Sequence, residues 1–451
     1  MRKPRLHALL LGCVTTVVIR TTVTAQTPPP SSAAPTDLTL NEVLTAALAQ
    51  HPLVQAARAQ VSAVEGRRQT ATTFPNPVAT YWMENTRFPG QRSASGLDRE
   101  ISAYATLPLE PFFQRRSRLT QATAEVRGAQ ATVTRAEQQV ALDAAHAFYE
   151  VALAQASVEA VQENRAAVEQ LVDYLRTRVA QGANPEGELI RAEVERDRLD
   201  TDVTLAEVAL LRAQATLRPF LGETGPPLVS LRVASLGVAR SAAPLAALSD
   251  FATHALQQRS DVLAARAKVD AASGDIAVER SLLVRQLGAT FGVKRTGGIS
   301  AMVAGVSVTV PLFDRNRGEI QRATGERLAA EQELRWLERT ISGEIEAAYQ
   351  AAEKLGARVA VTQPTFLGRA EESRRIALAA YQEGAATLLQ VLDASHALTD
   401  ARLTVARLVV AANESAFELG IAAGYDAMTA AQLGRNTPTT VASVGQEGGS
   451  R

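Results

Sequence analysis

The sequence predicts a mainly α-helical protein with a small β part, in which each chain contains two copies of one structural unit. An internal duplication is the first indication: residues 47–61 return as residues 255–269, with nine identities in fifteen positions at an offset of 208. Long stretches with an apolar residue at every seventh position, and short stretches of alternating apolar and polar residues, are the other two. A duplication of this kind is typical of folds in which equivalent units share one ring or tube.

The order of these patterns divides the chain into six segments. Each repeat is expected to contain a helix, two strands and a long helical hairpin. The segments are a signal peptide (1–25), a Pro- and Ser-rich spacer (26–36), a first repeat (37–222), a linker (223–245), a second repeat (246–424) and a disordered tail (425–451).

The signal peptide rests on Arg2, Lys3 and Arg5, which precede an apolar run and a small residue, Ala25, after which cleavage is expected. Cys13 offers an alternative, because Leu-Leu-Gly-Cys at residues 10–13 resembles a lipoprotein signal in which Cys13 is lipidated. Either leader implies that the chain is exported across the inner membrane.

The composition argues against several function classes. Basic and acidic residues both total 47, so no net charge attracts the chain to nucleic acid. The five histidines share no short ligand spacing, and no nucleotide-binding loop or nucleophile elbow is present. We therefore expect no enzyme activity, no cofactor and no bound metal.

Residues 114–181 predict one very long helix. They contain no proline and a single glycine, Gly128, and at 1.5 Å per residue they would extend about 100 Å. Apolar residues recur at strict sevens, which is the coiled-coil period, and alanines form additional stripes. Each helix should therefore have neighbours on two sides, as in a cylinder. In the corresponding helix of the second repeat, Pro364 predicts a kink or a break.

Four stretches of about ten residues alternate with period two and predict strands at residues 77–84, 101–109, 286–293 and 302–312. In the fourth stretch, Val306 belongs to the apolar face and Thr309 to the opposite face. This length fits a tilted strand that crosses an outer membrane. Four strands leave open edges that lipid cannot satisfy, so several chains would have to share one barrel, and three chains would give twelve strands. The alternative is a periplasmic coiled-coil scaffold with a soluble sheet and no pore.

Local motifs resemble those of the TolC-like outer-membrane efflux family, over nearly the whole mature chain. They are Phe-Pro-Asn-Pro at residues 74–77, Glu84-Asn85, Leu-Pro-Leu-Glu at residues 107–110 and Arg115-Arg116. The resemblance implies a trimeric twelve-stranded outer-membrane β-barrel that continues into a long α-helical coiled-coil barrel in the periplasm of a Gram-negative bacterium. The implied partners are two further copies of the chain, outer-membrane lipid, a periplasmic adaptor protein and an inner-membrane pump of the RND type.

These details look most like the branch that serves cobalt, zinc, cadmium or copper pumps. The resemblance therefore implies a passive duct that exports heavy-metal cations, while a duct for organic drugs or secreted polypeptides stays open as an alternative. At the periplasmic tips, Gly182 with Ala183 and Gly384 with Ala385 match the positions that meet the adaptor. Glycine suits a helix end because it adopts left-handed backbone angles and allows close approach.

The resemblance also implies a gate just beyond the tips. Glu188 and Asp393 match carboxylates that line or latch the entrance, and Tyr381 matches a tyrosine that hydrogen-bonds across it. Gln390 stands where some members carry a further acid, and Arg191, one turn from Glu188, offers a cation. Threefold symmetry would place three copies of Asp393 around the axis, where they would attract cations.

Overall fold

The computed structural model describes residues 37–86, 98–222, 227–234, 245–283 and 287–433. The expected signal peptide, the spacer, Cys13 and the last part of the expected tail lie outside the described residues. Residues from Asp37 onward form one compact unit.

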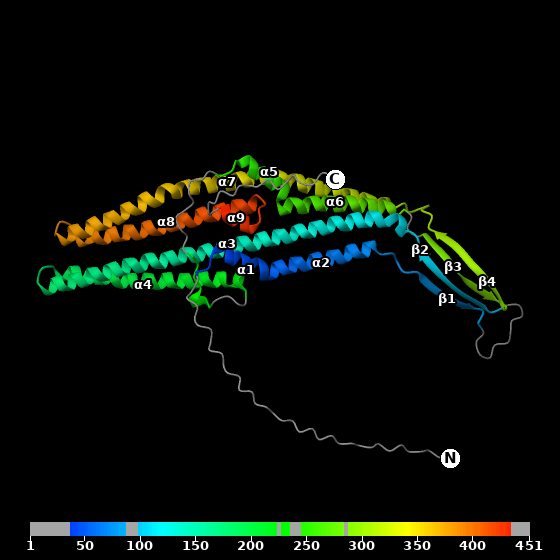
Figure 1. Cartoon of the computed structure of the whole chain (residues 1–451), viewed down its shortest axis with the longest axis horizontal. Coiled ribbons are helices and arrows are strands. Elements are labelled where there is room, and N and C mark those ends of the chain that lie inside the picture. The colour runs from blue at the N-terminus through cyan, green and yellow to red at the C-terminus, as the bar shows by residue number, and fades with distance from the viewer. Residues whose placement is uncertain (1–36, 87–97, 223–226, 235–244, 284–286, 434–451) are drawn as a thin grey trace, which may run out of the picture. The chain divides into compact units, whose positions relative to one another are not determined.

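The unit contains the same order of elements twice (Figure 1). The first half comprises α1 (Leu40–Gln50), α2 (Pro52–Thr72), β1 (Val78–Glu84), β2 (Glu100–Pro108), α3 (Pro111–Ala180) and α4 (Glu186–Leu217). Two short 3-10 helices follow, η1 (Arg218–Leu221) and η2 (Leu228–Ser230). The second half comprises α5 (Leu248–Gln258), α6 (Ser260–Ser281), β3 (Leu287–Thr296), β4 (Ile299–Val308), α7 (Arg317–Gln382) and α8 (Leu388–Ala422), and α9 (Ala427–Leu433) ends the described chain.

Helix α3 confirms the expectation drawn from its heptad rows. Val140, Ala147, Val168 and Leu175, which lie on one row, are all buried. The helix packs against α4 toward its C-terminal end and against α2 and α6 toward its N-terminal end, so it has neighbours on two sides (Figure 1). Among the described residues, no helix is both long enough and apolar enough to cross a lipid bilayer.

The largest hydrophobic core surrounds the middle of α3, where α1, α8 and α9 converge. Phe148 and Phe417 are fully buried there. A capping box starts α1, since the Thr39 side chain accepts from the Glu42 N–H and the Glu42 carboxylate accepts from the Thr39 N–H. The expected disordered tail is therefore wrong at its beginning: residues 427–433 are helical because their alanines pack into this core.

Glycine allows α6 to approach α3 unusually closely. A Cβ atom at Gly274 would lie 2.8 Å from the Cα atom of Gln121 on α3, closer than real side chains come. A second close approach occurs at Gly420 on α8, where a Cβ atom would lie 2.7 Å from Cβ of Ala430. These contacts set the spacing of the helices that carry the strands and the tips.

Helix α7 continues through Pro364: of the two expected outcomes, a break is wrong and a kink stays a prediction. Proline removes only one backbone hydrogen bond, and the turns on either side keep theirs. The side chain of Thr365 also donates to the Val361 carbonyl at 2.6 Å, which supports the turn around the proline.

The four strands form one antiparallel sheet in the order β1-β2-β3-β4. The register places Ala105, Phe291 and Ala304 in one row, and Thr106, Thr290 and Gly305 in the next row on the opposite face. One face is consequently mainly apolar, although it includes Arg295, and the other carries mainly polar or small residues together with Trp82 and Val303. The Thr106 and Thr290 hydroxyls on this second face are 2.9 Å apart.

The expected face of Val306 agrees with this register, but the expected end of the fourth strand does not. Strand β4 ends at Val308, so Thr309 belongs to neither face of the sheet. Alternation continued through residue 312 in the sequence, yet the last pair of the ladder joins Val308 to Leu287, where β3 begins.

The first prediction concerns helix spacing. Gly274→Ala should lower the thermal unfolding midpoint, because the added methyl group forces α3 and α6 apart, at a cost of about 1–3 kcal/mol. Gly66→Ala in α2 is the matched control: no atom lies within 4 Å of a Cβ there. It should stabilise the protein by up to ~1 kcal/mol, since alanine favours helix. Equal midpoints for the two variants would contradict the close approach.

Candidate functional site

The two helical hairpins end in the same backbone motif. Gly182 and Gly384 have φ angles of +69° and +78°, in the left-handed region. The N–H of Gly182 donates to the carbonyl of Val179, and the N–H of Ala183 donates to the carbonyl of Arg178, each at 2.9 Å. This pattern is a Schellman motif, which satisfies carbonyls at the end of α3.

The second tip repeats this arrangement. At the end of α7, the N–H of Gly384 donates to the carbonyl of Tyr381 at 3.1 Å, and the N–H of Ala385 donates to the carbonyl of Ala380 at 2.8 Å. A Cβ atom on either tip glycine would meet no atom within 4 Å. Both glycines are therefore required by backbone conformation rather than by crowding inside the protomer.

A hydrogen-bond network joins the two tips. The Tyr381 hydroxyl at the end of α7 donates to Oε2 of Glu188 on α4 at 2.8 Å. Nδ2 of Asn184, in the first tip, reaches the same Oε2 at 2.9 Å and the Tyr381 hydroxyl oxygen at 3.3 Å. Arg178 completes the network, because its Nε donates to Oδ1 of Asn184 at 3.2 Å. The structure thus brings together Glu188 and Tyr381, two of the residues that the sequence analysis placed at the gate.

Apolar packing supports this network. Tyr381 is buried in a cluster with Val172 and Leu175 of α3 and Leu388 of α8, and its ring meets Tyr174 edge-on with centroids 6.5 Å apart. Burial and the hydrogen bond to Glu188 raise the pKa of the Tyr381 phenol well above its ordinary value. The phenol therefore remains a hydrogen-bond donor throughout the neutral range and well into alkaline conditions.

Three other expected gate residues lie outside the network. Arg191 is exposed and forms no ion pair with any residue that the structure describes, so Arg178 is the cation next to Glu188 and Tyr381. Gln390 caps α8: its Oε1 accepts from the Thr387 N–H at 2.8 Å, and its own N–H donates to the Thr387 hydroxyl. Asp393 is exposed, one turn further along α8.

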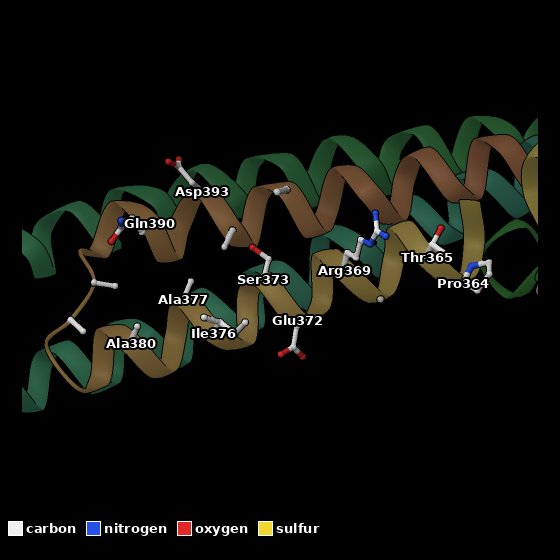
Figure 2. A pocket seen from close by; sticks show the side chains of 15 residues that line it. Pro364, Thr365, Arg369, Glu372, Ser373, Ile376, Ala377, Ala380, Gln390 and Asp393 are labelled. Atoms are coloured by element: carbon white, nitrogen blue, oxygen red, sulfur yellow. The ribbon is translucent and has the colours of Figure 1, made fainter. Parts of the chain in front are cut away.

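An open groove of about 1100 Å³ runs between α7 and α8 behind the second tip. Figure 2 shows Ser373 and Ala377 facing the space between the helices, while the carboxylates of Asp393 and Glu372 point away on opposite sides. Most residues along it are small, including Ala385 at the tip. The groove can therefore accept the side chains of another helix.

Sequence reasoning missed several residues that link the two repeats. On α8, Nε2 of His396 lies 2.8 Å from Oε1 of Glu195 on α4, and Arg402 pairs with Glu163 on α3. Further from the tips, Nδ1 of His146 on α3 lies 2.8 Å from Oε1 of a carboxylate on α8. No short spacing could reveal these pairs, since their members are far apart in the sequence.

The other described histidines also make structural contacts, either local or between distant segments. Nδ1 of His51 accepts from the Leu53 N–H at the start of α2, and the His254 ring stacks on Tyr425. The described part of the chain contains no group of three or more His, Cys, Asp or Glu residues that could hold a metal ion. The tips offer a hydrogen-bond network that includes the Glu188 carboxylate, and a neighbouring groove.

Residues 43–223 and 252–424 match the model of a family described as outer membrane efflux protein. The chain belongs to this family. Both matched segments contain one helix–strand–strand–hairpin repeat, which agrees with the duplication seen in the sequence. The protein is thus an outer-membrane efflux channel of the TolC type, and neither an enzyme nor a scaffold without a pore.

Two relatives are metal-resistance proteins of Cupriavidus metallidurans. The cobalt-zinc-cadmium resistance protein CzcC is 25% identical over 368 residues, which cover 81% of this chain and 85% of that protein. The nickel and cobalt resistance protein CnrC is 28% identical over 293 residues, or 64% and 67% of the two chains. The fold is similar to the crystal structure of the outer membrane protein VceC of Vibrio cholerae, with a TM-score of 0.68, 20% identity and coverage of 86% and 96%.

The second prediction concerns ionisation at the tips. A tyrosine with a raised pKa keeps its hydrogen bond below the ordinary tyrosine pKa of about 10 and loses it only as the pH rises through the raised value. In an alkaline titration of phenolate absorbance, Tyr381→Phe should therefore remove a late component. Glu188→Gln should move that component to lower pH, because the nearby charge is removed. A titration of Tyr381→Phe that matches wild type would contradict this assignment.

Proposed function

We propose that this efflux protein is the trimeric outer-membrane duct of a tripartite system that exports heavy-metal cations. The observation that carries the assembly is the sheet, in which β1 and β4 each leave one edge unpaired. Inside a bilayer, unpaired backbone N–H and C=O groups have no water to bind, so only a closed barrel is stable. Pairing β4 of one copy with β1 of the next, three times, closes a barrel of twelve strands.

The helices support the same assembly. Ile190, Val194 and Leu205 are exposed on α4, and Val361 and Ile376 are exposed on α7, although they continue the apolar pattern of long helices. Exposed apolar rows of this kind indicate a surface that a partner covers. Neighbouring copies would bury them and extend the barrel as a helical tunnel into the periplasm.

The metal cargo rests on the relatives and on charge at the mouth. CzcC and CnrC are named for resistance to cobalt, zinc, cadmium and nickel. Threefold symmetry would repeat Asp393 and Glu188 around the entrance, and a ring of carboxylates attracts cations. The duct itself would pass the ions in water, and the pump below would supply selection and energy.

Docking would use the tips. Gly182, Ala183, Gly384 and Ala385 are exposed or half-buried, and a Cβ at either glycine meets only open space. The adjoining groove between α7 and α8 offers small residues against which another helix can pack. A periplasmic adaptor with helical ends, joined to an RND-type inner-membrane pump, would fit this surface.

The third prediction tests insertion. Val306→Arg should reduce the amount of trimer in outer-membrane fractions, because an arginine on the lipid face costs free energy. Val306 lies two residues from the end of β4, so the cost should be below the roughly 2–4 kcal/mol of mid-membrane. Ser307→Arg is the matched control, since the neighbouring side chain lies on the polar face of the same strand. Equal trimer yields from both variants, or a wild-type protein found as a soluble monomer, would contradict the proposed barrel.

The fourth prediction tests the mouth by conductance in planar bilayers. Asp393→Asn should lower the preference for cations over anions, and Tyr381→Phe should raise conductance, because it removes the hydrogen bond that holds α7 to α4. Glu372→Gln serves as the control, since this carboxylate points to the other side of the groove (Figure 2). If selectivity and conductance in the double variant equal those of wild type, the gate lies elsewhere.

The fifth prediction tests docking. The double variant Gly182→Trp/Gly384→Trp should abolish cobalt, zinc and cadmium export by the complete system while trimer yield stays normal. The large side chains would block the close approach of the adaptor to the tips. Asn at both positions is the control, because asparagine tolerates left-handed backbone angles and separates bulk from strain. Export that survives both tryptophans would place the adaptor contact elsewhere.

A further inference from the structure

All four connections between strands and helices lie at the same end of the sheet, where the strands begin or finish. Val78 at the start of β1 pairs with Thr106 near the end of β2, and Leu287 at the start of β3 pairs with Val308 at the end of β4. This end of the sheet is therefore where it joins α2, α3, α6 and α7 (Figure 1). In the proposed barrel it marks the boundary between the membrane and the periplasm.

Exposed aromatic side chains gather at this boundary. Phe112 and Phe113 at the start of α3 are 66% and 63% exposed, and Phe313, just before α7, is fully exposed. Phe74 lies against Phe112, with ring centroids 5.3 Å apart. These aromatic side chains lie next to the end of the sheet at which its apolar face includes Leu107. Aromatic rings of this kind sit favourably at the level of lipid headgroups.

Five arginines share this boundary and lack acidic partners. Within the part of the chain that the structure describes, none of them forms a salt bridge, and all are exposed. Arg115 lies over the Phe74 ring at 5.6 Å and donates its Nε to the Thr72 carbonyl, so its terminal nitrogens remain available. The five are Arg115, Arg116, Arg280, Arg315 and Arg317.

The contrast with the next turn of α7 is informative. Arg322 pairs with four carboxylates, those of Asp275, Glu279, Glu319 and Glu326. Arg322 thus differs from the five boundary arginines, since its charge is balanced by several acidic side chains. The acids closest in sequence to the five arginines are Glu110, Glu279, Asp314 and Glu319. Arg322 already engages Glu279 and Glu319, so positive charge predominates there.

We infer that this surface, the arginine–aromatic belt, binds the phosphate groups of anionic phospholipids in the leaflet that faces the periplasm. Guanidinium groups match phosphate oxygens in pairs, and basic side chains at a membrane surface attract anionic headgroups while neighbouring aromatic rings occupy the interface. The inference rests on the proposed function, because it requires the sheet to lie in the membrane with this end on the periplasmic side.

The test uses the full-length trimer in detergent, titrated with phosphatidylglycerol or phosphatidylcholine while bound lipid is counted by native mass spectrometry. Phosphatidylglycerol should bind preferentially. The variant Arg115→Gln/Arg315→Gln/Arg317→Gln should lower that affinity about fivefold per arginine, the factor that corresponds to ~1 kcal/mol for each basic side chain. The control Arg335→Gln/Arg339→Gln/Arg358→Gln removes equal charge from exposed positions further along α7 and should leave lipid binding unchanged.

Equal affinity for both lipids would overturn the inference, and so would an equal loss of lipid affinity in both triple variants. A third contradicting result would be soluble glycerol phosphate that competes as strongly as the lipid, because it would indicate a site for free anions. Loss of adaptor binding in the belt variant with lipid affinity unchanged would show that the belt contacts protein and would equally overturn it. Bilayer conductance distinguishes a failure of the lipid-binding inference from a failure of the proposed channel function. A trimer that conducts but ignores lipid charge refutes only the belt, whereas a wild-type protein that neither forms trimers nor conducts refutes the proposed function.

Discussion

Close packing along helix α3 is the interaction on which the rest of the protomer depends. This 70-residue helix contacts α1, α2, α4, α6, α8 and α9, and it spans about 105 Å from the sheet to the first tip. Alanines such as Ala141, Ala144 and Ala145 are fully buried along it, and Gly274 lets α6 approach further. Because small side chains bring backbones together along the whole length, the positions of the strands and of the tips are set by one rigid element.

The duplication produces two hairpins with the same ending and different chemistry. Both tips use a glycine in a Schellman motif, but the first contributes Glu188 and Asn184 as partners, and the second contributes the Tyr381 hydroxyl. The repeats meet again in the sheet, where β2 pairs with β3. The repeats are therefore joined by a backbone ladder in the sheet, by helix packing along α3, and at the tips by side-chain hydrogen bonds and apolar packing.

Much of the fold and part of the site follow from local patterns. The heptad rows predicted α3, and alternation predicted four strands and the face of Val306, because periodicity is a property of neighbouring residues. Prediction failed where the alternating pattern extended beyond its strand, as at Thr309, and where tertiary packing ordered the start of an expected disordered tail, as in α9. Gln390 was assigned to the gate by its position, although Thr387 three residues earlier is the signature of a capping box, which a closer search for helix caps could have found.

The sequence by itself determined that two repeats of long helices and short strands would form, and that each tip would need a glycine. Only the tertiary structure decided which side chains meet. Tyr381 and Glu188 are 193 positions apart, and Arg178 rather than Arg191 lies beside them. The boundary arginines likewise come from different segments and lie at one end of the sheet because of strand register. Hydrogen bonds and charge interactions depend on distances of a few ångströms between remote segments, and no local period contains that information.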